Sequence, residues 1–104
     1  VTKICVDAFA GCRNLKYVAI PNDSKLRSIE DNAFASTQIR SFFIPPLLAK
    51  LNKNAFFCCG FLQIIEIDKD STLPFLNLGN INYNGLIIMI PRLKNDNFEI
   101  VKDN

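Results

Sequence analysis

Apolar residues recur along this chain in a fixed frame and not at the spacing of a long helix. An Ala-Phe pair at Ala8 is followed at set distances by cysteine, leucine, valine and isoleucine, which gives the pattern AFxxCxxLxxVxIP. The same frame returns at Ala55 and, one residue shorter, at Ala33. Self-similarity at a period of roughly 20 to 50 residues is the signature of a repeat protein. We therefore expect a stack of short repeats.

A second apolar pair precedes each copy and supports the same register. Its members are Leu26 and Ile29, Leu48 and Leu51, and Leu73 and Leu76. The last pair leads into a degenerate copy, in which Ile81 takes the place of phenylalanine. We expect a single repeat domain over residues 1–104, with approximate repeats at 4–28, 29–50 and 51–75 and a degenerate copy at 76–104.

Each copy holds one segment in which apolar residues alternate, as in a strand with one buried face. The residues expected to point inward are Val18 and Ile20, Phe42 and Ile44, Ile65 and Ile67, and Ile88 and Ile90. The Ala-Phe segment is expected to form a single helical or 3-10 turn that places Phe9, Phe34 and Phe56 in one core layer. Because no copy can bury its apolar side alone, the copies should stack into a solenoid.

Three segments, DAFAGCRNLKYVAIP, DNAFASTQIRSFFIP and KNAFFCCGFLQIIEI, resemble the BspA-like class of leucine-rich repeat, whose unit is AFxxCxxLxxIxIP. The resemblance covers residues 4–76 well. It implies an α/β, β-rich, right-handed leucine-rich repeat solenoid with a short parallel sheet on one face and helical or 3-10 turns opposite. It also implies frequent placement on cell surfaces and roles in adhesion or protein recognition. The departures are Thr37 for cysteine, Asp68 for proline and the degenerate fourth copy.

Composition fits a small folded domain, with 49% hydrophobic and 21% charged residues. The 12 basic and 10 acidic residues are interspersed, whereas a nucleic-acid surface needs clustered positive charge. The longest apolar run, at residues 85–91, is far shorter than the roughly 20 residues that cross a bilayer. We therefore expect neither nucleic-acid binding nor membrane insertion of this segment.

The common designs of nucleophilic catalysis cannot be built from this chain, because it contains no histidine. Carboxylate pairs remain, but ordinary solvation explains the acidic residues in turns and flanks, which are Asp7, Glu30, Asp31, Asp68 and Asp70. Its 4 glycines include no phosphate-binding loop. We expect no catalytic, cofactor-binding or metal-binding residues, and no enzymatic activity.

Four cysteines raise three alternatives: structural thiols, a disulfide or a zinc site. Cys12 and Cys59 hold the same repeat position two copies apart, so their separation should be about 10 Å, whereas a disulfide needs Cα atoms within roughly 7 Å. The adjacent Cys58 and Cys59, with no CxxC pair and no histidine, offer poor spacing for zinc. Buried thiols are the favoured interpretation, and a disulfide involving Cys5 or Cys58 is the alternative.

The residues that should face outward from the strands are unusually apolar. They form two columns, one of Tyr17, Ser41, Ile64 and Ile87 and the other of Ala19, Phe43, Glu66 and Met89. A contiguous patch with aromatic residues and methionine is typical of protein interfaces. The alternative is that a loop, a second chain or the segment around Phe98 and Ile100 covers the patch.

The leading hypothesis is a non-catalytic recognition or adhesion module that binds a protein or extracellular-matrix partner through this face, with self-association as an alternative. A competing hypothesis is a repeat spacer in a longer array, with binding elsewhere. The chain begins at Val1 without a leader, which favours a processed product or a fragment of a larger surface protein. Asn22-Asp23-Ser24 is an N-glycosylation acceptor triplet in an expected exposed turn, and it matters only in a secreted eukaryotic protein.

Overall fold

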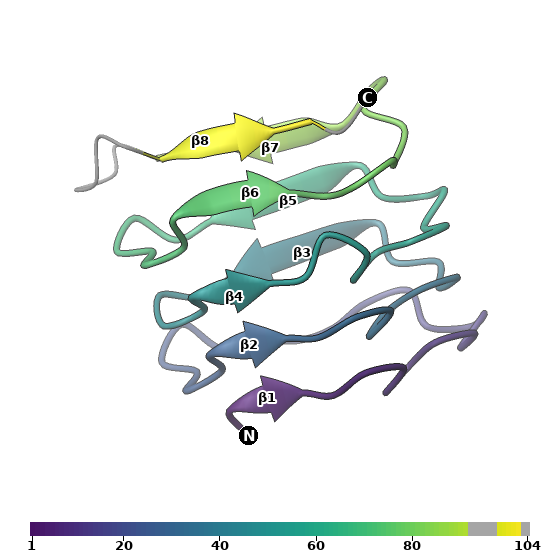
Figure 1. Ribbon diagram of the computed structural model, residues 1–104, viewed down its shortest axis with the longest axis horizontal. Helices are drawn as coiled ribbons and strands as arrows, with labels where there is room; N and C mark the ends of the chain where they lie inside the picture. The colour runs from purple at the N-terminus through teal and green to yellow at the C-terminus, as the bar shows by residue number, and fades with distance from the viewer. Residues whose placement is uncertain (92–97, 103–104) are drawn as a thin grey trace.

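Eight short strands and no helix make up the described part of the chain, residues 1–91 and 98–102 of a computed structural model (Figure 1). The chain winds as a β-solenoid, and the second, third and fourth coils each contribute one strand to each of two opposite sides. In chain order the strands are β1 (Lys3–Ile4), β2 (Ser28–Ile29), β3 (Ser41–Ile44), β4 (Lys50–Leu51), β5 (Ile64–Ile67), β6 (Phe75–Asn77), β7 (Ile87–Met89) and β8 (Glu99–Val101).

All strand pairs are parallel, and they lie on both sides of the solenoid instead of on one. Strands β3, β5 and β7 form one sheet, as the alternating segments predict. On the opposite side β1, β2 and β4 form a second sheet, and β6 pairs with β8 (Figure 1). The expectation of a sheet on one face only is therefore wrong. The second apolar pair of each repeat supplies these extra strands, with Ile29 beside Leu51 in the ladder.

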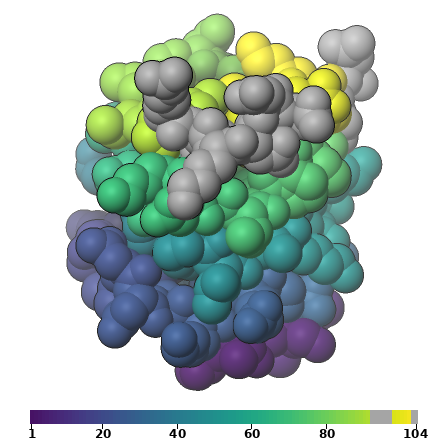
Figure 2. All heavy atoms as spheres, turned by 90° about the vertical axis from the view of Figure 1, so that its left-hand side faces the viewer, coloured from purple at the N-terminus to yellow at the C-terminus, as the bar shows by residue number. Residues whose placement is uncertain are grey.

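The strands distinguish successive coils of the solenoid. The first coil contains β1 and the extended segment 15–20, the second contains β2 and β3, the third β4 and β5, and the fourth β6 and β7. Figure 2 shows the coils as successive layers from the N-terminus upward. The Ala-Phe turns join the two sides at one end of the strands, to the right in Figure 1.

The Ala-Phe segments form consecutive β-turns, and the expected helical or 3-10 turn is wrong. Within the first coil the amides of Ala8 and Ala10 donate to carbonyls three residues earlier, at 3.1 and 3.2 Å. Between them the amide of Phe9 donates instead to the Ala33 carbonyl of the second coil, at 2.8 Å. A 3-10 helix would need every amide to bond within its own turn. Asp7, with φ of 59°, also interrupts any helical run.

The stacked apolar positions form one core. The three complete second apolar pairs are buried, at Leu26, Ile29, Leu48, Leu51, Leu73 and Leu76. The three phenylalanines form a ladder in which Phe34 stacks on Phe9 at 5.5 Å and on Phe56 at 5.6 Å between ring centroids. Phe34 and Phe56 are fully buried, whereas Phe9 in the outermost coil is 43% exposed. The common core layer is therefore complete only where a coil has neighbours on both sides.

Two of the expected inward-facing segments differ from the structure. Residues 15–20 are extended but form no strand, and Val18 and Ile20 are half-buried. This segment has a neighbouring coil on one side only, and the Gln38 backbone amide of that coil donates to the Leu15 carbonyl at 2.9 Å. In the fourth coil β7 ends at Met89, so Ile90 lies outside the strand and is 44% exposed. The prediction that Ile90 points inward is wrong.

Candidate functional site

The outward side of the β3–β5–β7 sheet carries two straight columns of side chains. Parallel pairing aligns Ser41 with Ile64 and Ile64 with Ile87. The neighbouring column contains Phe43, Glu66 and Met89 in the same register. Each partner in a column comes from a different coil, so the regular stacking of the coils brings together six residues that are far apart in sequence. We call these six residues the outer face.

The outer face exposes apolar side chains. Ile87 is 57% and Met89 is 50% exposed, and Phe43 and Ile64 are half-buried. Glu66 is the charged member and lies between Phe43 and Met89 in its column. Exposed apolar groups gathered on one surface favour contact with a partner, whereas single exposed apolar residues are common on any protein.

Tyr17 and Ala19 do not join these columns in a strand. Both are exposed, Tyr17 at 69%, and both line a separate hollow of about 390 Å³ at the first coil. The same hollow is lined by Phe9 and Val1, so it is formed by the uncovered apolar side of the outermost coil. The structure thus brings six of the eight predicted face residues together in one sheet and places these two at its margin.

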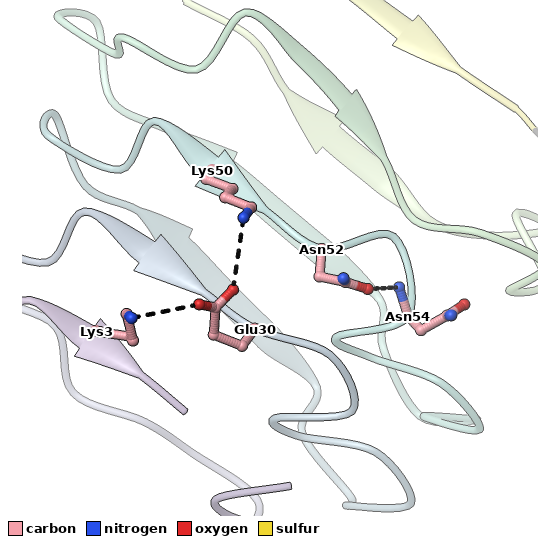
Figure 3. A network of polar contacts seen from close by, with 5 residues as sticks. All are labelled: Lys3, Glu30, Lys50, Asn52 and Asn54. Atoms are coloured by element: carbon pink, nitrogen blue, oxygen red, sulfur yellow. Dashed lines mark hydrogen bonds and ion pairs between the residues drawn. The ribbon is translucent and has the colours of Figure 1, made fainter. Parts of the chain in front are cut away.

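The opposite sheet has a different surface. Glu30 lies between two lysines, with its carboxylate 3.7 Å from Lys3 Nζ and 4.0 Å from Lys50 Nζ (Figure 3). The lysine side chains are 56% and 70% exposed, so water screens both ion pairs and each contributes at most about 1 kcal/mol to stability. This charged arrangement is typical of a solvated surface, in contrast to the apolar outer face.

The segment around Phe98 and Ile100 does not lie on the β3–β5–β7 sheet. Strand β8 pairs with β6 on the opposite side, with Ile100 beside Leu76. Phe98 and Ile100 are partly buried and pack against the common core. The structure therefore gives these two residues a role in the core.

The cysteines divide into one buried thiol and three exposed ones, and all four are free. Cys59 is buried, as expected, and its Sγ donates to the Phe34 carbonyl oxygen at 3.1 Å. Cys12 is exposed, so the prediction of a buried thiol is wrong for it. The physical reason is its place in the outermost coil, where no further coil covers its position. Within residues 1–91 and 98–102 no cluster of three candidate ligands could hold a metal ion.

Sequence reasoning missed a hollow of about 490 Å³ between the third and fourth coils. Its lining includes Ile64 and Ile87 of the outer face together with a group of asparagines. One signal for it was present in the sequence. Phe56 and Ile65 are nine positions apart, whereas the equivalent Ile81 and Ile88 of the degenerate copy are only seven apart.

No helix in the described ranges has the length and apolar character needed to cross a membrane. Comparison with curated proteins and with solved structures gave no significant match. A family model does match: the BspA type leucine-rich repeat region, in six copies across residues 1–91. The resemblance inferred from the AFxxC frame is thereby confirmed. Because the match covers well over half of its length, the chain belongs to the BspA-type leucine-rich repeat family, which suggests a repeat or recognition module and is generally non-enzymatic.

Proposed function

We propose that this chain is a non-catalytic recognition module that binds a protein partner at a cell surface or in the extracellular matrix through its outer face. The observation that carries the proposal is the contrast between the two sheets. The outer face presents Ile64, Ile87 and Met89 to solvent, whereas the opposite sheet presents lysines around Glu30. Protein interfaces are enriched in aromatic residues and methionine and depleted of lysine.

Family membership supports the proposal in two respects. Leucine-rich repeats commonly mediate protein interactions, and proteins with BspA-type repeats are typically surface-associated. A parallel sheet with short side-chain columns is also a rigid platform, so a partner would bind without a large ordering cost in this chain. Tyr17, exposed at the margin of the sheet, and Ala19 would extend the contact toward the first coil.

The test replaces two apolar members of the outer face by lysine. In the double variant Phe43→Lys, Met89→Lys, both lysines would stand beside Glu66 in their column, because Glu66 pairs with each position. The variant would resemble the Lys3–Glu30–Lys50 arrangement of the opposite sheet, so we expect the fold to survive. Native chain and variant are immobilised and compared for partner capture from cell-surface and matrix extracts, with circular dichroism as the check on folding.

The matched control is Phe75→Lys, because Phe75 lies on β6 of the opposite side and is 46% exposed, close to the value for Met89. A partner held by the native chain and by the control, but lost by the double variant, would support binding through the outer face. Equal capture by all three would favour a spacer role or a site elsewhere. Sedimentation of the purified chain tests self-association, which the double variant should abolish if a second copy occupies this face.

A further inference from the structure

The hollow between the third and fourth coils has two walls of different origin. Residues 57–60, which follow the Ala-Phe pair of the third coil, form one wall, and residues 80–82, 84 and 85 of the fourth coil form the other. Its volume of about 490 Å³ falls within the range of roughly 300 to 1,000 Å³ usual for small-molecule sites. Every residue that lines it belongs to the described part of the chain.

The shortened fourth coil explains why the hollow exists. This coil has two residues fewer between its turn and its strand. The turn of the third coil is therefore covered only in part: Phe56 and Cys59 are buried, whereas Phe57 is 52% exposed and Cys58 is exposed. At the other end of the turn the two coils approach closely, because a Cβ atom on Gly79 would lie only 2.7 Å from the Lys53 carbonyl oxygen. The asparagine-rich turn also has an internal hydrogen bond, in which Asn82 Oδ1 accepts from the Asn84 backbone amide at 2.9 Å.

The polar lining consists of carboxamides with a single charged group. The amide side chains are Asn54, Gln63, Asn80, Asn82 and Asn84. Lys53 is the one charged residue of the lining, and no carboxylate takes part. A carboxamide both donates and accepts hydrogen bonds. A hydroxyl group does the same, so the two are natural partners, whereas a fully anionic ligand would want several arginines or lysines.

Most of these carboxamide side chains form no hydrogen bond within the described part of the chain. Within residues 1–91 and 98–102, no hydrogen bond is formed by the side chains of Asn54, Gln63, Asn80 or Asn84. Figure 3 shows the case of Asn54, whose backbone amide bonds to Asn52 Oδ1 at 2.8 Å while its side chain extends away from that contact. Four carboxamides around one hollow are therefore available to a ligand.

The apolar lining complements this polar set. The Phe57 ring is 52% exposed, and Ile64 and Ile87 border the hollow from the outer face. A sugar ring has hydroxyl groups at its rim and C–H groups on its faces, so it needs hydrogen-bonding groups and an apolar or aromatic surface together. The hollow offers both.

We propose that the hollow between the third and fourth coils binds a neutral, hydroxyl-rich oligosaccharide. Carboxamides of Gln63, Asn80 and Asn84 bind its hydroxyl groups, and Phe57 packs against a ring face. The proposal goes beyond protein recognition and does not depend on it, because Phe43 and Met89, which test the outer face, do not line the hollow.

The probes are four neutral trisaccharides, built of glucose, galactose, mannose or N-acetylglucosamine. Each is titrated into the isotope-labelled chain, and the side-chain amide resonances of asparagine and glutamine are followed by NMR. We expect at least one trisaccharide to shift the resonances of Gln63, Asn80 and Asn84 in a saturable manner. A neutral glutamine-rich peptide is titrated in parallel.

Single-residue variants then test whether the sugar binds at this hollow. Gln63→Ala and Asn84→Ala remove side chains that have no intramolecular bond, so both should fold, and each should weaken binding about fivefold, the size of one hydrogen bond. Asn22→Ala is the matched control, since it removes an exposed carboxamide from the first coil. The control and the double variant Phe43→Lys, Met89→Lys should both bind the sugar as the native chain does.

Three results would overturn the proposal: no shift with any of the four trisaccharides, equal weakening in Asn22→Ala, or tighter binding of the peptide than of every sugar. Loss of protein capture by the outer-face variant with sugar binding intact would leave both proposals standing. Sugar binding without any protein partner would support this site and reject the proposed function.

Discussion

Phe34 shows most clearly how one residue holds neighbouring coils together. It is fully buried, stacks on Phe9 and Phe56, and meets Phe42 at 5.6 Å between ring centroids. We expect Phe34→Ala to lower the free energy of unfolding by about 3 to 5 kcal/mol, because truncation leaves a cavity between three rings. That is a large share of the stability of a small domain. Chemical denaturation followed by circular dichroism measures the change.

Phe9→Ala serves as the comparison, since Phe9 holds the same repeat position but is 43% exposed. Its loss should cost less than about 2 kcal/mol, because water already reaches the ring and fills the space. Equal losses for the two variants would contradict the burial difference between the outermost and the inner coils.

Thiol reactivity distinguishes the four cysteines. Cys5, Cys12 and Cys58 are exposed, whereas Cys59 is buried beneath the Phe34 carbonyl. We expect three thiols to react quickly with a chromogenic disulfide in the native protein and the fourth to react only after denaturation. In Cys59→Ala every remaining thiol should react quickly. A slow thiol that persists in this variant would place another cysteine in the core.

The identity of core residues was predictable, but their degree of burial was not. The repeat frame correctly assigns Phe34, Phe56 and Cys59 to the core. It assigns Phe9 and Cys12 there as well, because a sequence pattern treats all copies alike and does not register that the outermost coil has one neighbour. Thr37 illustrates the reverse case. It departs from the frame yet is buried, because its hydroxyl donates to the Phe34 carbonyl at 2.9 Å and so replaces the cysteine thiol.

At the scale of elements, the turn that opens the fourth coil depends on glycine. Gly79 has φ of 67°, and a Cβ atom there would lie 2.7 Å from the Lys53 carbonyl oxygen. We expect Gly79→Ala to destabilise the protein by at least about 2 kcal/mol, from the left-handed conformation together with the clash. The thermal midpoint and chemical denaturation of the variant measure the effect.

Substitutions at two other glycines separate the cost of the left-handed conformation from the cost of the clash. Gly85 has φ of 76° but open space around it, so Gly85→Ala should show the conformational cost alone, about 1 to 2 kcal/mol. Gly60 also has open space around it, and its φ is not positive. The free energy of unfolding of Gly60→Ala should therefore stay within about 1 kcal/mol of the native value. A Gly79→Ala protein as stable as Gly60→Ala would refute the close approach of the two coils.

The strands were easier to predict than the turns. Alternation of apolar residues locates β3 and β5, since a period of two is specific to strands. The second apolar pairs give no such signal, because the strands β1, β2 and β4 have only two residues each and are too short to show a period. The second sheet could therefore not be predicted from alternation. For the Ala-Phe segments, the sequence pattern led to an expectation of a single helical or 3-10 turn, and the structure has consecutive β-turns instead. Their amides alternate between bonds within a coil and bonds to the next coil, and only the stacked structure shows the second kind.

For the whole molecule, the two candidate sites differ in how far the sequence could reveal them. The columns of the outer face follow from the regular register of repeats, so Ser41, Ile64 and Ile87 could be aligned in advance. The hollow arises from a mismatch between the third coil and a fourth coil that is two residues shorter. Its volume depends on how the coils stack, which a repeat pattern does not give. Irregular copies in a repeat array are therefore the places to search for sites.

Stability should also vary along the solenoid, because each coil contacts only its neighbours. In the first coil the amides of Phe9 and Gly11 bond to the second coil, and in the second coil the amides of Phe34 and Ser36 bond to the third in the same way. These four hydrogen bonds have similar lengths, 2.8 to 2.9 Å, so their geometry does not distinguish the first coil from the second. The first coil, however, lies at the outer end, where Phe9 is 43% exposed and Phe34 is fully buried.

Native-state hydrogen exchange at single-residue resolution tests this gradient. We expect Phe34 and Ser36 to exchange only through near-global unfolding, and Phe9 and Gly11 to exchange faster by about tenfold or more, through opening of the first coil alone. Mild denaturant should accelerate the exchange of Phe34 and Ser36 more strongly, because their opening exposes more surface. Uniform protection across both coils would mean that the whole chain unfolds as one unit, and the additive view of coil stability would have to be abandoned for this protein.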